Sequence, residues 1–314
     1  MKRLISSFLA ALLLWALTMP SLHAAEALTL KPQRLSEHAW MVEGFSALGS
    51  QENHNFISNA GIIVGPDGVV LVDALGSPEL ARALLAAIKQ LTDKPLRAVI
   101  LTHYHADHVY GLQVLKAAGA KIIAQQVGRE YLNSDTAAQR LKASIDQGLV
   151  EPDTRLVPAD EWIGTDTPLT VAGLDLQLIP VGPAHTPEDL AVWLPADKLI
   201  FAGDIVFRGR VPFVGQADSR RWIASLDRLL TRPAAIVVPG HGPASTEALK
   251  DLLLTRDYLA YLRATMGRAA RDMTPFDEAY AATDWSAWEH LPLFKQANRM
   301  NAYNTYLLME HEGD

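Results

Sequence analysis

The chain has 314 residues, of which 49% are hydrophobic and 20% are charged. That length allows one large domain or two modest ones with a buried core. The formal net charge is −7, and no Lys/Arg run occurs beyond the extreme N-terminus, which argues against a nucleic acid as substrate or partner. The chain has no cysteine, which excludes disulfides, a lipid-attachment site and thiolate metal ligands, and which fits an oxidising compartment.

The N-terminal segment predicts a cleaved signal peptide. A positively charged start precedes the apolar run Leu4–Met19, and Pro20 ends that run shortly before Ala24 and Ala25. The run is near the lower length limit for a membrane span, so an uncleaved anchor is the competing interpretation. We expect a periplasmic or secreted protein with no stable membrane insertion after cleavage.

The first half of the remaining chain predicts strands that alternate with helices. A strong turn signal, Gly65-Pro66-Asp67-Gly68, separates two apolar stretches and predicts a hairpin. Proline in the first turn and apolar residues at helical spacing predict the helix Ser77–Leu91. The other expected elements are strands at Ala39–Glu43, Phe56–Val64, Val69–Val72, Arg97–Leu101 and Lys121–Ala124, and a helix at His108–Ala118.

The second half continues this order and ends in helices. A longer helix is expected near Arg129–Gln147, followed by a Pro/Asp-rich connector. The expected elements after it are strands at Leu169–Ala172, Leu174–Ile179, Leu190–Leu194, Leu199–Ala202 and Ala235–Val238, and a helix at Ser219–Leu230. From Ser245 the sequence is helical and rich in Trp and Tyr. This order predicts a layered α/β domain with a helical C-terminal extension.

Three of the ten histidines fall within six residues after the strand Arg97–Leu101. His103 and His105 are two positions apart, so an extended backbone points both side chains to the same side. Asp107 and His108 follow as the chain turns into a helix, which directs them toward a neighbouring point. Two adjacent groups of nitrogen and oxygen donors suit divalent ions such as zinc. The alternative is a polar turn, but so dense a cluster would repel itself when protonated.

Three further metal-ligand candidates each follow a predicted strand. They are His185 in Gly-Pro-Ala-His-Thr-Pro, Asp204 in Phe-Ala-Gly-Asp and His241 in Pro-Gly-His-Gly. Loops at strand ends are where a rigid sheet presents its functional groups. Each candidate alone is weak, because turns often contain such residues beside glycine or proline. Together with the histidine cluster they complete a set of seven donors.

The sequence Thr-His-Tyr-His-Ala-Asp-His at Thr102–His108, followed in order by His185, Asp204 and His241, resembles the metallo-β-lactamase superfamily. The resemblance extends from about Ala39 to Ser245. It implies an αββα sandwich with the site at one edge of its two sheets. We therefore expect a signal peptide at 1–25, a metallo-β-lactamase-fold domain at 26–250 and a helical C-terminal extension, 251–314, packed on that domain.

The resemblance also implies roles for individual residues. It implies two metal sites that share one carboxylate: His103, His105 and His185 for the first ion, Asp107, His108 and His241 for the second, and Asp204 as the bridge. Asp73 matches an aspartate that supports the histidine loop, although an ordinary turn role is the alternative. Two zinc ions that share a bridging water make hydroxide available to attack a carbonyl carbon. Asp107 is the catalytic candidate, since it can both bind metal and orient this hydroxide.

The surroundings of Asp204 favour ester or thioester hydrolysis over β-lactam hydrolysis. Antibiotic-degrading members usually have cysteine or serine at that position, and many have a lysine shortly after it, whereas Ile205–Arg210 contains none. The segment Leu199–Phe207 and the Pro-Gly-His-Gly loop are similar to glyoxalase II and its relatives, although the glutathione-binding basic residues have no clear match. The whole chain is similar to exported zinc metallohydrolases associated with quinoprotein relay systems and sulfur oxidation.

The sequence therefore predicts an exported dinuclear zinc hydrolase that cleaves an ester, thioester or lactone carbonyl of a small molecule. Iron or a mixed metal pair is the alternative metal content. The alternative functions are a metallo-β-lactamase, a mononuclear-iron persulfide dioxygenase and a non-catalytic periplasmic partner. Arg208 and Arg210 are candidates for binding an anionic substrate group, and His54 is a candidate at the mouth of the site. Surface or turn roles are the alternatives for these three.

Overall fold

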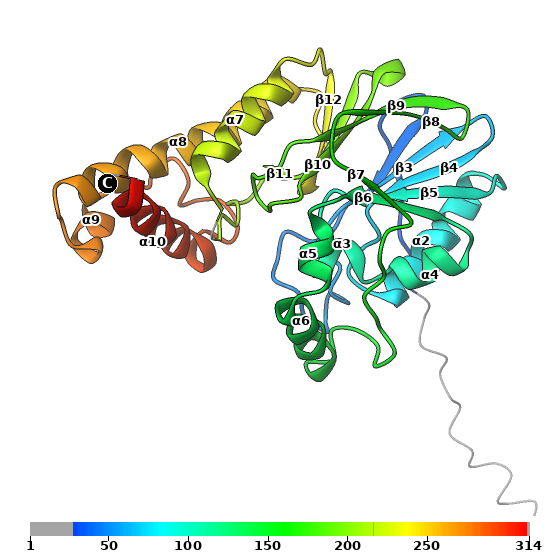
Figure 1. The fold of residues 1–314 in the computed structure, drawn as a ribbon, viewed down its shortest axis with the longest axis horizontal. Helices are drawn as coiled ribbons and strands as arrows, with labels where there is room; N and C mark the ends of the chain where they lie inside the picture. The colour runs from blue at the N-terminus through cyan, green and yellow to red at the C-terminus, as the bar shows by residue number, and fades with distance from the viewer. Residues whose placement is uncertain (1–27, 216, 313–314) are drawn as a thin grey trace, which may run out of the picture.

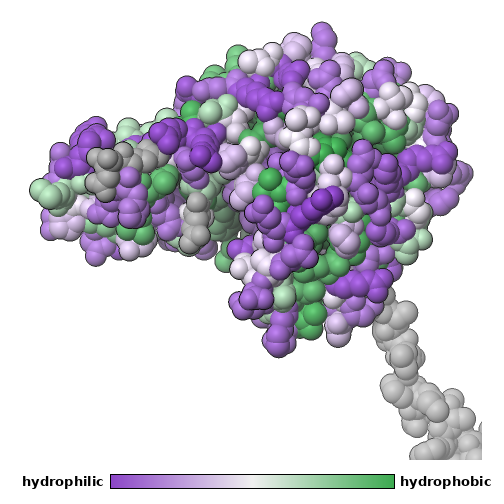
Figure 2. All heavy atoms as spheres, viewed as in Figure 1, coloured by the Kyte–Doolittle hydropathy of each residue, from purple (hydrophilic) through white to green (hydrophobic). Residues whose placement is uncertain are grey.

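A computed structural model describes residues 28–215 and 217–312, and the expected signal peptide lies outside these residues. Two β-sheets pack face to face, helices cover their outer faces, and a helical arm projects from one side (Figure 1). Figure 2 shows hydrophilic side chains over much of the arm and a notch between its lower edge and the main body. Among the described helices, none has the length and apolar character that a membrane span requires.

The first sheet has seven strands in the order β1-β2-β3-β4-β5-β6-β7. Its strands are β1 Gln33–Arg34, β2 Ala39–Val42, β3 Ala60–Gly65, β4 Gly68–Val72, β5 Leu96–Ile100, β6 Lys121–Gln125 and β7 Glu161–Ile163. Pairing is antiparallel from β1 to β4 and parallel from β4 to β7. The parallel strands bring the chain to the same sheet edge each time, which places the residues after β4 and β5 side by side.

The second sheet has five strands in the order β12-β11-β10-β9-β8. Its strands are β8 Thr167–Val171, β9 Leu174–Pro180, β10 Leu190–Leu194, β11 Leu199–Phe207 and β12 Ile236–His241, with a short 3-10 helix, η1 Pro195–Asp197, after β10. The β8–β9 and β9–β10 pairs are antiparallel, and β11 pairs with β12 in parallel.

The helices form three groups (Figure 1). On the first sheet lie α2 Pro78–Leu91, α3 Ala106–Val109, α4 Leu112–Ala117, α5 Gly128–Leu132 and α6 Asp135–Asp146. Helix α7 Ser219–Leu230 covers the second sheet together with the start of α8 Ala248–Arg271. The remainder of α8 forms the arm with α9 Phe276–Ala282 and α10 Phe294–Glu312.

Three apolar cores hold these layers together. Between the sheets, Ile63 and Ile100 pack against Val192 and Phe201. The other two cores lie between each sheet and its helices, and Trp222 of α7 is the largest fully buried side chain. Every residue of β4 and of β11 is buried, as expected for strands covered on both faces. The predicted αββα sandwich with C-terminal helices is confirmed.

Two helices predicted as continuous are broken in the structure. The predicted helix His108–Ala118 consists of α3 and α4, which separate at Gly111, where a Cβ would lie 2.0 Å from a backbone oxygen. The predicted helix Arg129–Gln147 consists of α5 and α6, because Ser134 Oγ accepts a hydrogen bond from Ala137 N at 3.2 Å and begins a new helix. Strand β7 forms where the sequence predicted only a connector.

Strands β11 and β12 are longer than predicted, and their extra residues include Asp204 and His241. The register of β11 against β12 shifts around Gly203, which has a φ of 54° and lies against Thr102. Such irregularities redirect side chains near active sites. The shift therefore directs Asp204 out of the regular strand alternation.

Asp197 connects the two sheets near η1. Its carboxylate accepts a hydrogen bond from Ser36 Oγ, one from His38 N at 2.9 Å, and one involving His38 Nδ1 at 2.7 Å. Burial alone would raise the pKa of Asp197, but these hydrogen bonds outweigh burial and hold the pKa below its usual value. The folded protein therefore favours the ionised carboxylate.

We predict that Asp197→Asn lowers the free energy of unfolding at pH 7 by about 1.5–3 kcal/mol, the scale of hydrogen bonds to a charged group. Because the folded state lowers the pKa of Asp197, this contribution is present at neutral pH and disappears as the pH falls through the folded-state pKa. Urea unfolding at several pH values measures it, with the exposed Asp93→Asn as control. A difference that stays constant well below the ordinary Asp pKa of about 3.9 would contradict the assignment.

Candidate metal centre

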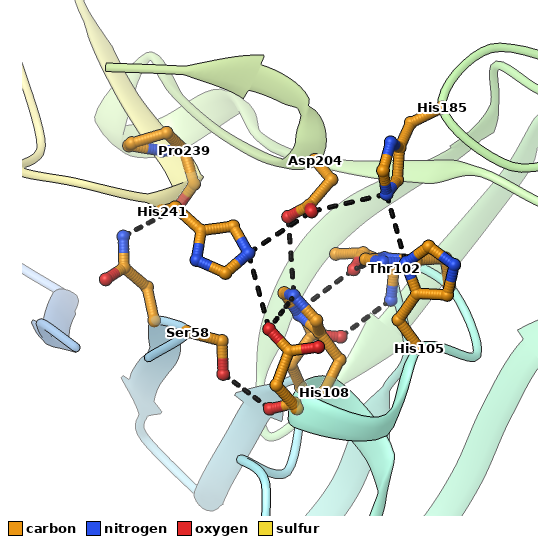
Figure 3. Close-up of polar contacts among 12 residues, drawn as sticks. Ser58, Thr102, His105, His108, His185, Asp204, Pro239 and His241 are labelled. Carbon is orange, nitrogen blue, oxygen red and sulfur yellow. Dashed lines mark hydrogen bonds and ion pairs between the residues drawn. The ribbon is translucent and has the colours of Figure 1, made fainter. Parts of the chain in front are cut away.

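The structure brings all seven predicted donors together at the edge of both sheets (Figure 3). The ligand atoms fall into two groups, each within 4.8 Å: His103, His105, His185 and Asp204 in one, and Asp107, His108 and His241 in the other. The loop after β5 supplies His103 and His105, and α3 supplies Asp107 and His108. The second sheet and its loops supply the remaining three donors. Residues more than 130 positions apart in the sequence thus share one small volume.

Asp204 contacts both groups. Its Oδ2 lies 3.4 Å from His185 Nε2 and 3.2 Å from His241 Nε2, and its Oδ1 lies 3.3 Å from His108 Nε2. The residue is only 4% exposed. A buried carboxylate in this position has the geometry to serve both groups at once.

Hydrogen bonds away from the centre orient the imidazoles of His185 and His241. His185 Nδ1 lies 3.0 Å from the carbonyl oxygen of Phe213, and His241 Nδ1 lies 2.6 Å from that of Ile57. A carbonyl oxygen only accepts, so each Nδ1 carries the proton and each Nε2 presents its lone pair to the centre. His105 is turned the other way, and its Nδ1 lies 3.0 Å from His185 Nε2.

Asp73 orients the histidine loop, Thr102–His108, through hydrogen bonds. Its carboxylate lies 2.8 Å from His108 Nδ1 and accepts hydrogen bonds from Thr102 N and Thr102 Oγ1, both at 2.8 Å. Thr102 Oγ1 also lies 3.0 Å from His103 Nδ1. Asp73 is 3% exposed and adopts a φ of 67° after β4. It therefore fixes both the start of the loop and the ring of His108, the position that the family resemblance implies.

Burial and neighbouring charges hold the donors in forms that bind metal. Burial lowers the pKa of His103 and His185, and it lowers the pKa of His105 to about 3. Burial alone would raise the pKa of Asp204 and Asp107, but the neighbouring imidazoles outweigh it and lower both pKa values. Neutral imidazoles and ionised carboxylates are the protonation states that metal binding requires.

The charge at His108 differs from that of the other histidines. Burial alone would lower its pKa, but Asp107, Asp73 and Asp204 outweigh burial and hold its pKa well above the usual value. The three carboxylates around His108 therefore favour a positive charge at this position, which a bound cation would supply.

Three buried atoms of the centre have no hydrogen-bond partner among the residues that the structure describes: His103 Nε2, His108 Nε2 and Asp204 Oδ1. Buried polar atoms without partners are costly and uncommon, so each requires an explanation. A divalent cation in each group would satisfy all three. The donor set, which consists of imidazole nitrogens and carboxylate oxygens, fits zinc.

Several supporting residues were not predicted from the sequence. Ser58 Oγ donates to the backbone oxygen of Asp107. Asn59 Nδ2 donates to the carbonyl oxygens of Pro239, at 2.8 Å, and Gly242, at 2.7 Å, and so fixes the residues on either side of His241. The only signal in the sequence was a polar pair inside an otherwise apolar stretch.

A cavity of about 270 Å³ opens onto the donors. Five of its lining residues are apolar (Ala47, Leu48, Ile57, Ala106 and Phe213), and two are arginines (Arg140 and Arg210). A larger cavity of about 590 Å³ lies beside the start of α8 and contains none of the predicted site residues. The smaller cavity is therefore the substrate-site candidate.

Of the three predicted substrate-binding residues, only Arg210 lines this cavity. Arg208 Nε lies 3.0 Å from Asp251 Oδ1 on α8, so its side chain is directed elsewhere. His54 Nδ1 lies 3.6 Å from a carboxylate oxygen of Glu79 in a separate surface depression. Arg140, which no sequence motif marks, reaches the cavity from α6.

Comparison with curated proteins identifies two kinds of relative. The chain is 28% identical over 240 residues to the linear primary-alkylsulfatase of Pseudomonas sp. (strain ATCC 19151), which covers 64% of this chain and 45% of that protein. It is 27% identical over 236 residues to the metallo-β-lactamase type 2 of Bacillus sp. (strain 170), which covers 74% of this chain and 82% of that protein. The chain thus spans less than half of the alkylsulfatase and most of the β-lactamase.

Solved structures with the same fold fall into the same two kinds. A metallo-β-lactamase from Pontibacter korlensis matches with a TM-score of 0.59 and 24% identity over 74% of this chain and 99% of that one. A double mutant of the sec-alkyl sulfatase PisA1 matches with a TM-score of 0.69 and 20% identity over 89% of this chain and 50% of that one. Since 89% of 314 residues is about 279 and only 247 residues precede α8, the second match extends into the arm.

The family model of the metallo-β-lactamase superfamily matches residues 55–241, which is more than half of the chain. These residues include all seven donors of the centre. This match confirms the family that the histidine loop predicted. The chain belongs to the metallo-β-lactamase superfamily.

Proposed function

We propose that this chain is a dinuclear zinc hydrolase that cleaves esters or thioesters of small molecules. The observation that supports the proposal most directly is the position of Asp204, within 3.4 Å of imidazoles from both donor groups. A carboxylate shared by two groups suits a pair of ions about 3.5–4 Å apart. The donors are nitrogen and oxygen atoms in a chain without cysteine, which favours zinc, with iron as the alternative.

The chain's own residues would supply positioning and charge. Zinc bound by these donors would lower the pKa of water and polarise the scissile carbonyl. Asp107 has the more accessible of the two carboxylates, with its side chain 18% exposed against 5% for Asp204. It lines the cavity, so we assign to Asp107 the orientation of the attacking water through a hydrogen bond.

The size of the cavity supports a small substrate. Its volume of about 270 Å³ lies below the range of roughly 300–1,000 Å³ that is typical for drug-sized ligands. A short ester or thioester fits that space. The presence of Asp204 where antibiotic-degrading members usually have cysteine or serine supports the same choice.

Hydrolysis of an alkyl sulfate ester is a second candidate. The specific observation in its favour is that the match to a sec-alkyl sulfatase extends into the C-terminal arm. The β-lactamase match covers 74% of the chain, and the residues before α8 are enough to account for that share. A linear primary-alkylsulfatase is also among the relatives.

We predict that zinc-loaded wild-type protein binds two equivalents of zinc, that His241→Ala retains about one, and that Asp204→Ala retains less than one. The reason is that Asp204 contacts both donor groups, whereas His241 belongs to one. Elemental analysis after desalting measures the content, and the exposed Asp175→Ala on β9 is the control. Two full equivalents in Asp204→Ala, or a single equivalent of iron in the wild type, would refute the shared-carboxylate assignment.

We predict that kcat/KM for a short ester or thioester exceeds that for β-lactams by about 10²-fold, because a substrate that is misplaced in the cavity loses rate on that order. The comparison uses zinc-loaded mature protein with a p-nitrophenyl ester, a short thioester, a short alkyl sulfate and several β-lactams, and Asp204→Ala as the inactive control. Fastest turnover of the alkyl sulfate would select the second candidate. Fastest turnover of a β-lactam would overturn both.

We also propose that the protein acts outside the cytoplasm after loss of roughly its first 25 residues, as expected for a signal peptide. In support, Leu30, only a few residues after the expected cleavage point, is 4% exposed and belongs to an apolar core. Mass spectrometry of protein from a periplasmic fraction should give a mature chain that starts near Ala25 or Glu26. Full-length protein in the membrane fraction would indicate an anchor instead.

A further inference from the structure

We propose that Arg210 binds an anionic group of the substrate, so that this hydrolase selects small esters that carry a carboxylate or a sulfate. This inference deepens the proposed function and rests on it. The shared chemistry of the two groups is an oxyanion with two or more oxygens that accept hydrogen bonds. A planar guanidinium donates two parallel hydrogen bonds to such a group.

The guanidinium of Arg210 is buried without a counter-ion. The residue is 3% exposed, and within the described part of the chain no carboxylate oxygen lies within 4.0 Å of it. Its Nε has no hydrogen-bond partner there either. Its Nη1 lies 3.2 Å from His241 Nδ1, but that nitrogen already donates its proton to Ile57 and has no lone pair for Arg210.

A buried charge without a partner is destabilising, so its presence beside the donors indicates a ligand. Arg210 packs over the rings of Phe207, at 5.6 Å, and Phe213, at 5.0 Å, which stabilises a cation only in part. Burial lowers the pKa of Arg210, and Asp204 and Asp107 at longer range offset this effect only in part. Divalent ions in the two donor groups would offset these carboxylates, and an anionic substrate would then be the balancing charge.

The C-terminal arm holds Arg210 in place. Asn301 of α10 donates from Nδ2 to the carbonyl oxygen of Pro212 at 2.7 Å and accepts at Oδ1 from Val214 N at 2.9 Å. Asn304 Nδ2 donates to the carbonyl oxygen of Gly215 at 2.6 Å. These bonds fix the segment that follows Arg210, so the guanidinium is positioned before a substrate arrives, which lowers the entropic cost of binding.

The rest of the cavity fits the same substrate class. Ala47, Leu48 and Ile57 supply an apolar wall for a short carbon chain. Arg140 lines the cavity from the exposed surface of α6, where its charge attracts an approaching anion. The substrate that fits the cavity is therefore short, apolar along its carbon chain and negatively charged at one end.

The test compares two esters of equal chain length, p-nitrophenyl butyrate and mono-p-nitrophenyl succinate, which differ in a terminal carboxylate. Wild-type protein should prefer the succinate ester. Arg210→Gln should lose about 10- to 100-fold in kcat/KM for the succinate ester, mainly through KM, the range expected for a hydrogen bond to a charged group. The preference of Arg210→Gln for the succinate ester over the butyrate ester should fall by a similar factor, and the preference of Arg210→Lys should lie between those of wild type and Arg210→Gln because lysine lacks the planar fork.

Arg208→Gln is the matched control. It removes the same charge only two residues away, but the side chain of Arg208 pairs with Asp251 and does not line the cavity. It should retain the preference for the succinate ester. Zinc content and Tm are measured for every variant, and only variants that match the wild type in both are compared. If Arg210→Gln fails this criterion, Arg210→Lys carries the comparison.

A binding measurement separates this inference from the proposed function. Calorimetric titration of zinc-loaded protein with succinate and with methyl sulfate should give binding that weakens at least tenfold in Arg210→Gln, and the tighter ligand identifies the preferred oxyanion. Arg210-dependent binding with no hydrolysis of any ester would contradict the proposed function alone. Equal hydrolysis of both esters by wild type and Arg210→Gln, with unchanged anion binding, would overturn the role of Arg210.

Discussion

The attraction between one buried carboxylate, Asp204, and the imidazoles of His108, His185 and His241 is the constraint on which the site depends. These imidazoles come from three different segments, and Asp204 lies within 3.4 Å of each. A carboxylate removed from water requires compensating positive charge. The imidazoles supply it in part, and a pair of divalent ions would complete it. The irregular register of β11 around Gly203 is what places the carboxylate there.

The surrounding structure keeps these groups from relaxing away from one another. Asp73 and Thr102 fix the histidine loop on the first sheet, and Asn59 joins that sheet to the residues beside His241. The carbonyl of Phe213 orients His185, and the arm in turn fixes the segment that contains Phe213. The C-terminal helices therefore contribute to the centre through hydrogen bonds from asparagine side chains to the backbone of that segment, although none of the seven donors lies on them.

The metal donors could be predicted because their signal is local and chemically unusual. Thr102–His108 contains four candidate ligands in seven residues, and the strand-end positions of the others follow from short apolar runs. Asp73 could be predicted only through the family resemblance, since an aspartate after a strand is common. The sandwich followed from the order of strands and helices, but the breaks at Gly111 and Ser134 depend on close packing and on a cap that compete with helical spacing.

The substrate side of the cavity was harder to predict, because it depends on contacts between distant segments. Arg208 and Arg210 are two residues apart, and extended backbone would point them the same way. Gly209 has a φ of 70°, so the chain turns between them, and one arginine reaches α8 while the other reaches the cavity. Arg140 lies 70 residues earlier on an amphipathic helix with no local motif. Only the tertiary structure relates these two cavity arginines.

We have proposed that the seven donors hold two metal ions that share Asp204. The most direct measurement is X-ray diffraction from crystals of the zinc-loaded protein at the zinc absorption edge. We expect two anomalous peaks, one among His103, His105 and His185 and one among Asp107, His108 and His241, with the carboxylate of Asp204 between them. A single peak at full occupancy, or two peaks of which only one is bound by Asp204, would contradict it.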